Sequence, residues 1–438
     1  MKRKGYKKII SFFLILSVVS GISACSENPD HKPSETTESL VEYSVEEKSG
    51  IIQDSGIIHD SSEDNIANSN DEFSEAEGYS SENVDNDDSS DFPEEWQDDG
   101  IFSSKYQRAY ELVKSMSTEE KVGQILLARC PAVDALSEAK EFHLGGYILF
   151  GRDIVGKTKN ELTGDIRSYV DSQDIPMIVA VDEEGGTVSR LSLNNELTKS
   201  PFKSPRELFA EGGIHAITED TKNKCKLMKK LNINTNLAPV CDISKMPGDF
   251  MYDRSLGQNP DITADYVSQY TKVSQENGIS VTLKHFPGYG NNVDTHTSVA
   301  VDKRTYETFL KNDFIPFKAG IEAGAHMVLV SHNIVECMDK NNPASLSPEV
   351  HEVLRKELGF TGIIVTDDLA MDAIGKYVTD VSPYTAAVLA GNDMLCVSDY
   401  VTAYSDILRD ISIGTIEIDM INHAAMRVIA WKMTKNML

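Results

Sequence analysis

Charged residues and histidines follow several short apolar runs of the sequence, at the point where each run ends. These groups are Asp182-Glu183-Glu184, Lys284-His285, Ser331-His332, Asp367-Asp368 and Ser398-Asp399, with Arg190 a short distance after the first. Carboxylates and imidazoles can act as nucleophiles and as general acids or bases. Singly, each group has a structural explanation, since Asp367-Asp368 could cap a helix. Together they predict one site, provided that the ends of the runs meet in space.

Eight short apolar or β-branched runs are the elements that would bring these groups together. They lie at residues 123–128, 146–150, 177–181, 233–240, 280–283, 327–330, 363–366 and 394–397. Such runs are typical of parallel strands that are covered on both faces. A doubly wound open sheet would give the same alternation of strands and helices. Polar groups after so many strand ends favour a barrel, whose strand ends all meet at one mouth. We therefore predict an α/β fold, a (β/α)8 TIM barrel.

The segments between these runs carry apolar residues at helical spacing. The clearest predicted helices are residues 161–172, 264–277, 304–323 and 348–358. Gly278, Gly324 and Gly359 follow three of them, and glycine is common where a helix ends. Residues 101–438 contain no obvious linker and have a length that suits a single catalytic barrel.

A longer pattern identifies a family that this chain resembles. Residues 284–290 read Lys-His-Phe-Pro-Gly-Tyr-Gly, and Asp294-Thr295-His296 follows them. This pattern resembles that of glycoside hydrolase family 3, in the branch of the bacterial β-N-acetylhexosaminidases. The resemblance continues through residues 128–131, 149–152, 181–191, 237–240, 254–257 and 366–369. It therefore covers essentially the whole predicted barrel.

The resemblance implies a retaining, two-step glycosidase. Asp367 aligns with the nucleophile of the family, which attacks the anomeric carbon and forms a covalent glycosyl-enzyme. Lys284 is a plausible cationic neighbour that would keep this carboxylate ionised. His296 aligns with the acid/base of the branch, and Asp294 resembles the partner that holds its imidazole. Standing alone, an Asp-x-His pair would equally suit a solvated loop.

The resemblance also implies a set of sugar contacts. Asp182 and Arg190 resemble the pair that holds the distal hydroxyls of the sugar. Arg254, Lys284 and His285 resemble the contacts around the ring and the N-acetyl group. We assign no catalytic role to Glu183, Glu184 or Asp368, and the implied mechanism needs no cofactor.

The loop after the predicted fifth strand departs from the family pattern. Tyr289 stands where the family usually has histidine, Thr295 replaces a usual serine, and the loop is one residue shorter. These departures affect how His296 would swing into place, but both catalytic groups are present.

The first 25 residues form a predicted lipoprotein signal peptide. A basic stretch precedes an apolar run over residues 9–19, which is too short to span a bilayer. The small residues before Cys25 resemble the signal that directs acylation of a cysteine, which would anchor the protein to the outer face of the cell membrane. An ordinary secretory signal that is cut near Ala24 is the alternative.

Residues 26–100 form a predicted disordered, acidic linker. They hold 24 Asp or Glu but only two Lys, so they cannot bury enough apolar surface to offset chain entropy. Of the net charge of −27, the first 25 residues contribute +5 and the linker −22, which leaves −10 for residues 101–438. Such a domain has no basic patch for nucleic acid. Carbohydrate and the membrane are therefore the predicted partners.

The residues leave several other functions open. A β-glucosidase of the same family is the nearest alternative, although those relatives generally lack the Asp-x-His loop. A β-N-acetylglucosaminide phosphorylase is another, because a histidine acid/base repels incoming phosphate less than a carboxylate would. A non-catalytic, glycan-binding lipoprotein would not need the combination of Asp367, Asp294 and His296. A metal-dependent barrel hydrolase is a weaker alternative, because His285, His296, His326 and His332 form no compelling ligand set. The remaining cysteines show no spacing typical of disulfide or zinc sites, which predicts free, buried thiols.

Overall fold

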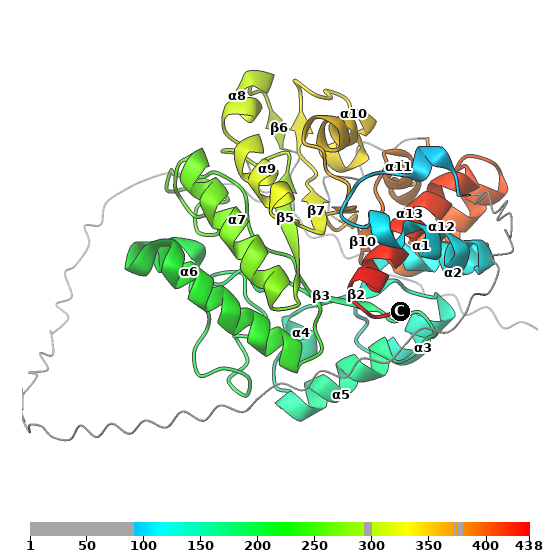
Figure 1. The fold of residues 1–438 in the computed structure, drawn as a ribbon, viewed down its shortest axis with the longest axis horizontal. Helices are drawn as coiled ribbons and strands as arrows, with labels where there is room; N and C mark the ends of the chain where they lie inside the picture. The colour runs from blue at the N-terminus through cyan, green and yellow to red at the C-terminus, as the bar shows by residue number, and fades with distance from the viewer. Residues whose placement is uncertain (1–91, 293–299, 371–373, 375–379) are drawn as a thin grey trace, which may run out of the picture. The chain divides into compact units, whose positions relative to one another are not determined.

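The computed structural model describes residues 92–292, 300–370, 374 and 380–438, and every structural statement below concerns these residues (Figure 1). The N-terminal 91 residues lie outside this part of the chain. The predictions for the signal peptide, Cys25 and most of the acidic linker therefore stay predictions.

The described part of the chain is built around an eight-stranded parallel sheet. Its strands are β1 (Leu126–Arg129), β2 (Gly146–Leu149), β3 (Ile178–Val181), β4 (Thr235–Asn236), β5 (Ser280–Phe286), β7 (Met327–Val330), β9 (Ile363–Thr366) and β10 (Leu395–Val397). They pair in the order β10-β1-β2-β3-β4-β5-β7-β9. A parallel bridge between Val365 and Met394 joins the two ends of this order. The sheet is therefore a nearly closed barrel, and the predicted TIM barrel is confirmed.

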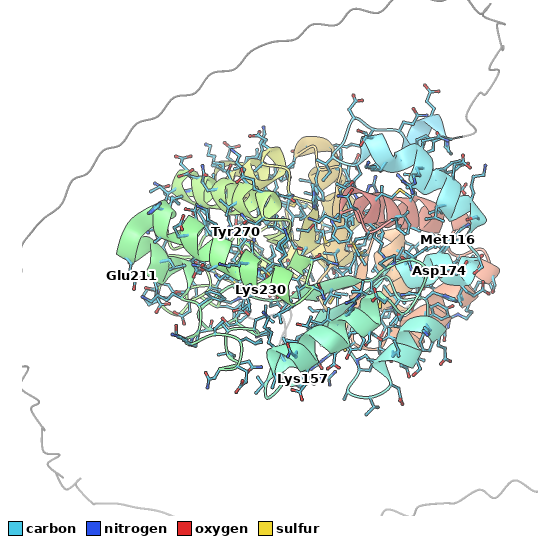
Figure 2. All side chains as sticks on the ribbon, turned by 60° about the horizontal axis from the view of Figure 1, so that its bottom comes forward. Met116, Lys157, Asp174, Glu211, Lys230 and Tyr270 are labelled. Carbon is cyan, nitrogen blue, oxygen red and sulfur yellow. The ribbon has the colours of Figure 1, made fainter. Side chains whose placement is uncertain are left out.

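Helices surround the strands, as in a (β/α)8 barrel. They are α1 (Ser103–Ser115), α2 (Thr118–Gln124), α3 (Ala135–Glu141), α4 (Gly151–Ile154), α5 (Lys159–Val170), α6 (Pro205–Lys230), α7 (Pro260–Glu276), α8 (Tyr306–Lys311), α9 (Phe314–Glu322), α10 (Pro348–Glu352), α11 (Pro383–Leu389), α12 (Tyr400–Ser412) and α13 (Ile418–Thr434). In Figure 2, Glu211 and Lys230 mark α6 and Tyr270 marks α7, and the two helices lie side by side. Among the described residues, no helix combines the length and the apolar character that crossing a membrane requires.

Three predicted strands differ from the observed ones by more than one residue at an end. The fifth was expected at 280–283, but β5 continues to Phe286. The first was expected at 123–128, but α2 occupies residues up to Gln124, because Ser117 and Glu120 form a capping box that starts a helix there. The fourth was expected at 233–240, but β4 covers only Thr235–Asn236. Pro239 has no N–H with which to continue the ladder.

The predicted helix at 304–323 is in fact two helices, α8 and α9. A continuous helix would need the N–H of residue 316 to donate to the carbonyl of residue 312, and Pro316 has no N–H. Pro316 instead lies in the first turn of α9, where that hydrogen bond is not required. The helix break leaves Asp313 buried, with its carboxylate paired to Arg304 at 2.8 Å.

The last helix, α13, packs across the amino-terminal ends of the strands. Its Trp431 is fully buried and donates a hydrogen bond from Nε1 to the hydroxyl of Ser280, the first residue of β5. Residues just before α1 pack on the same helix. The ring of Trp96 stacks on His423 with 5.2 Å between centroids, and Phe92 lies 5.2 Å from Tyr110.

These contacts correct the boundary of the predicted linker. We expected residues 92–100 to belong to the disordered segment and the folded domain to begin at residue 101. Instead, residues 94–96 form a short 3-10 helix, and the side chains of Phe92 and Trp96 pack on α1 and α13. The aromatic rings of Phe92 and Trp96 explain the difference, since they supply apolar surface that the rest of the predicted linker rarely offers.

Candidate active site

A cavity of about 740 Å³ lies at the carboxyl ends of the barrel strands. Its wall includes six of the residues that the sequence singles out: Asp182, Arg190, Arg254, Lys284, His285 and Asp367. They come from the loop after β3, from β5, from the residue after β9 and from the loop before α7. A parallel barrel brings these distant segments to one mouth because all of its strands run in the same direction.

Lys284 and Arg254 share one buried carboxylate, that of Glu184. The ammonium of Lys284 lies 2.6 Å from Glu184 Oε1 and 2.7 Å from Asp182 Oδ1. Arg254 donates to both oxygens of Glu184, at 3.0 Å from Nε and 2.7 Å from Nη2. Burial by itself would raise the pKa of Glu184, but Arg254 and Lys284 outweigh it and hold this pKa far below its usual value. Glu184 is therefore an anion at neutral pH that positions two cations of the wall.

His285 is held in one tautomer by its two neighbours. Its Nδ1 lies 2.8 Å from Asp242 Oδ2, and its Nε2 lies 3.2 Å from Nη2 of Arg254. A guanidinium can only donate, so Nε2 accepts and Nδ1 carries the proton that is donated to Asp242. Asp242 also accepts from the backbone N–H groups of His285 and Tyr289. Burial tends to raise the pKa of Asp242, but His285 and these hydrogen bonds lower it overall.

An irregularity in β5 allows two consecutive side chains to line the same cavity. Side chains normally alternate between the faces of a strand, so Lys284 and His285 would point in opposite directions. The pairing of β5 with β7 shifts register between Leu283 and Phe286. Such a bulge turns a side chain toward a new direction, and bulges are common next to active sites.

Asp182 and Arg190 stand together, as the resemblance implies, with 3.9 Å between Asp182 Oδ2 and Nη2 of Arg190. The loop that carries Arg190 is held by Glu183. The carboxylate of Glu183 accepts from the N–H groups of Arg190 and Leu191 and from the hydroxyl of Ser192. Glu183 therefore shapes the loop.

Asp367 directly follows β9 and lines the cavity. Its N–H donates to the carbonyl of Val330 at 3.0 Å, and its Oδ1 accepts from the N–H of Asp368 at 2.9 Å. The carboxylate of Asp368 accepts from both the N–H and the hydroxyl of Ser398. These bonds fix the turn on which Asp367 sits to the neighbouring strands β7 and β10.

Asp294 and His296, the predicted acid/base pair, lie outside the described residues. The residues on both sides of that segment are tied together by Arg304. This guanidinium donates to the carbonyl of Gly288 and pairs with the buried carboxylates of Asp302 and Asp313. Asp302 also accepts from the side chain of Asn292 at 3.0 Å. Tyr289, the departure from the family pattern, is buried and packs against His285.

Four residues of this region were not predicted from the sequence to have a role here: Glu184, Asp242, Arg129 and Phe150. Glu184 was named without an assigned role. Asp242 follows the predicted fourth strand and could have been found by the rule applied to the other strand ends. Arg129 and Phe150 likewise lie at the ends of β1 and β2 and line the cavity.

Among the described residues, the possible metal ligands form no metal cluster, and the cysteine thiols are free. Within them, no three His, Cys, Asp or Glu side chains gather where they could hold a metal ion. Cys130, Cys225, Cys241 and Cys396 are free and buried, as predicted, whereas Cys337 is free and exposed.

The fold and the cavity define an enzyme of the barrel type, with polar groups at the carboxyl ends of the strands. Residues 117–431 match the glycosyl hydrolase family 3 N terminal domain. The chain therefore belongs to this family of glycosidases.

The relatives and solved structures with which the chain can be compared agree with this assignment. A beta-hexosaminidase of Xanthomonas campestris pv. campestris (strain B100) is 30% identical over 235 residues, which are 52% of this chain and 70% of the relative. A family 3 beta-N-acetylglucosaminidase structure from Paenibacillus sp. str. FPU-7 superposes with a TM-score of 0.68 at 28% identity, over 74% of this chain and 63% of that one. The beta-N-acetylhexosaminidase structure from Beutenbergia cavernae DSM 12333 gives a TM-score of 0.65 at 25% identity, over 73% and 99%. The chain thus spans less than two thirds of the Paenibacillus protein.

Proposed function

We propose that the protein is a retaining exo-β-N-acetylglucosaminidase, which removes terminal β-linked N-acetylglucosamine from a glycan. The observation that carries this proposal is that Asp367 and the residues expected to contact a sugar line one and the same cavity. Relatives named as beta-hexosaminidases support the substrate class. The acetamido specificity and the roles of individual residues are the proposed parts.

In the proposed first step, a carboxylate oxygen of Asp367 attacks the anomeric carbon of the sugar. The glycosidic C–O bond breaks, and the leaving oxygen takes a proton from His296. In the second step, a water oxygen attacks the same carbon, His296 takes a proton from this water, and the ester bond to Asp367 breaks. Two inversions give net retention at the anomeric carbon.

The paired charges of the wall suit a sugar ring with many hydroxyl groups. Asp182 offers carboxylate oxygens as acceptors, while Lys284 and Arg190 offer donors beside it. Because these groups are already held by Glu184 and by one another, they need little rearrangement when the sugar binds. This arrangement supports the proposed substrate contacts of Asp182, Arg190, Arg254, Lys284 and His285.

We further propose that the protein is anchored by lipid at Cys25 on the outer face of the cell membrane and acts on peptidoglycan-type glycans. The basic, apolar and small residues before Cys25 support the anchor. Labelling of growing cells with radioactive palmitate tests it. Cys25→Ala should lose both the label and membrane fractionation, and retention of the label would contradict the anchor.

The function is tested by turnover of aryl β-N-acetylglucosaminide and aryl β-glucoside. We expect release from the acetamido substrate, a loss of about a thousandfold or more in Asp367→Ala, and a strong reduction in His296→Ala. Asp174→Ala serves as the matched control, because Asp174 is exposed on the loop before β3 (Figure 2). Folded wild-type protein that turns over neither substrate would contradict the proposal and favour a glycan-binding lipoprotein. Turnover of the glucoside alone would favour a β-glucosidase.

A further inference from the structure

Arg129 is a cation of the cavity wall that the proposed sugar contacts do not use. It is the last residue of β1, and it lines the same cavity as Asp367. Among the described residues, Arg190, Arg254 and Lys284 of this wall each have a carboxylate within 4.0 Å. No hydrogen bond or ion pair joins the side chain of Arg129 to any described residue, and its buried Nε has no hydrogen-bond partner. A buried donor without an acceptor costs about 1–3 kcal/mol, so this one calls for an explanation.

Two guanidinium groups lie beside the ring of Phe150 in the cavity wall. The guanidinium carbon of Arg129 lies 4.5 Å from the centroid of the Phe150 ring, and that of Arg190 lies 5.7 Å from the same centroid. Contact with the ring occupies the faces of the guanidinium planes, which leaves their N–H edges for other partners. Two like charges beside one ring repel each other, and an anion that contacts both would offset this repulsion.

The guanidinium group of Arg190 also lacks hydrogen-bond partners for some of its donors. It donates to the carbonyl of Ser189 at 3.1 Å, and its pairing with Asp182 is long, at 3.9 Å. Like that of Arg129, its Nε is buried and has no hydrogen-bond partner. One wall of the cavity therefore holds two neighbouring guanidinium groups, each with a buried Nε that lacks a hydrogen-bond partner.

We propose that Arg129, together with Arg190, binds an oxyanion in the active-site cavity. A phosphate, sulfate or carboxylate group offers several acceptor oxygens and a negative charge, and it can take two forked guanidinium groups at once. A neutral sugar hydroxyl could accept one of these hydrogen bonds but would leave the charge uncompensated. Arg129 would thus set specificity for an anionic ligand beside the sugar site. This inference rests on the proposed function, because it places the oxyanion beside the proposed sugar site. Its test measures phosphate binding and does not require that the protein is a glycosidase.

Two sources could supply this oxyanion, and they share the same chemistry. One is an anionic substituent on the glycan itself. The other is free phosphate that replaces water in the second step, in which a phosphate oxygen would attack the anomeric carbon and the carboxylate of Asp367 would leave, giving a glycosyl phosphate. Experiments on the full chain can separate binding from its source.

The first experiment is calorimetric titration of the full chain with inorganic phosphate at constant ionic strength. We expect saturable binding that Arg129→Gln weakens at least about tenfold, because a charge-assisted, forked contact is lost. Arg129→Lys should recover only part of the affinity, since it keeps the charge but not the fork. Arg108→Gln, an exposed arginine on α1, serves as the matched control and should bind like wild type. Thermal unfolding of each variant without phosphate checks that it is folded.

The second experiment distinguishes the sources and keeps the two proposals apart. Asp367→Ala should lose turnover but keep phosphate binding, so failure of the glycosidase assignment leaves this test intact. Formation of a glycosyl phosphate that is lost in Arg129→Gln would identify free phosphate as the ligand. Competitive inhibition by phosphate without that product, together with a lower KM for a phosphorylated or sulfated aryl glycoside than for the plain one, would identify a substituent of the glycan. Absence of saturable phosphate binding to wild type, or unchanged binding by Arg129→Gln, would overturn the proposal.

Discussion

At the scale of single residues, Glu184 organises the charges of the cavity wall. It accepts from Arg254 through both carboxylate oxygens and from Lys284, and its side chain is almost completely buried. Replacing it would leave two buried cations without their shared partner. Such a loss is far more costly than the loss of an exposed ion pair.

We predict that Glu184→Gln lowers the free energy of unfolding by about 3 kcal/mol or more at neutral pH. The folded-state pKa of Glu184 lies below its ordinary value of 4.5, so this carboxylate stabilises the wild type above that pH and progressively less below it. The gap between variant and wild type should therefore narrow as pH falls below about 4.5. Urea unfolding across this range measures the gap. A difference in unfolding free energy between variant and wild type that stays constant from neutral to acidic pH would contradict the ionic role of Glu184.

The second prediction at this scale concerns Asp242, the partner of His285. Its Oδ2 accepts from the ring of His285, and its Oδ1 accepts from the N–H of Tyr289. An asparagine has a single carbonyl oxygen, so Asp242→Asn must leave one of these donors unpaired. We expect kcat/KM to fall about tenfold or more, mainly through KM, because His285 is a proposed substrate contact. Asp174→Asn is the control, and an unchanged KM in a folded Asp242→Asn would contradict this role.

At the scale of elements, the segment at 288–304 is held by an ion cluster at its two ends. Arg304 ties the end of β5, through the carbonyl of Gly288, to β6 (Val301–Asp302) and to the start of α9. The short strand β6 pairs in turn with β8 (Ile334–Val335). The proposed acid/base, His296, is carried between these two anchored ends.

We predict that Arg304→Gln lowers kcat more than it raises KM. The sugar contacts of the barrel would stay in place, whereas the anchors on both sides of His296 would be lost. Removal of one partner from a buried ion cluster should also cost about 3–5 kcal/mol of stability. The neighbouring Lys303→Gln is the control, since Lys303 is exposed and its contact with Glu336 is 4.0 Å long. Steady-state kinetics with the aryl glycoside decide the matter, and equal kcat values for both variants would refute the expectation.

At the scale of the whole molecule, the folded unit begins before α1. The segment at 92–100 brings Phe92 and Trp96 onto α1 and α13, and the N–H of Ile101 donates to the hydroxyl of Thr361. This segment therefore connects the first and last helices of the barrel, and none of its residues lines the cavity.

We predict that a chain that begins at residue 92 is more stable than one that begins at residue 101, by about 2 kcal/mol or more. The longer chain keeps the partly buried aromatic rings of Phe92 and Trp96, and their loss exposes apolar surface of α1 and α13. Urea unfolding of the two truncated chains tests this difference. Equal midpoints would place the start of the folded unit at residue 101 after all.

The order of elements and most of the candidate site were predictable from sequence, because both depend on local patterns. Apolar runs of strand length alternate with helical spacing, and a parallel barrel places whatever follows each strand at one mouth. Asp182, Lys284, His285 and Asp367 could therefore be assigned to one site before their contacts were known.

Only the tertiary structure decided which of these groups are partners. The distance along the sequence from Glu184 to Arg254 is 70 residues and that from Asp182 to Lys284 is 102, and both pairs are in contact. The irregularity of β5 has the same origin, and so does the lack of a hydrogen-bond partner for the Arg129 side chain. Each depends on side-chain distances across neighbouring elements, to within a few tenths of an ångström, and no local pattern of residue types specifies those distances.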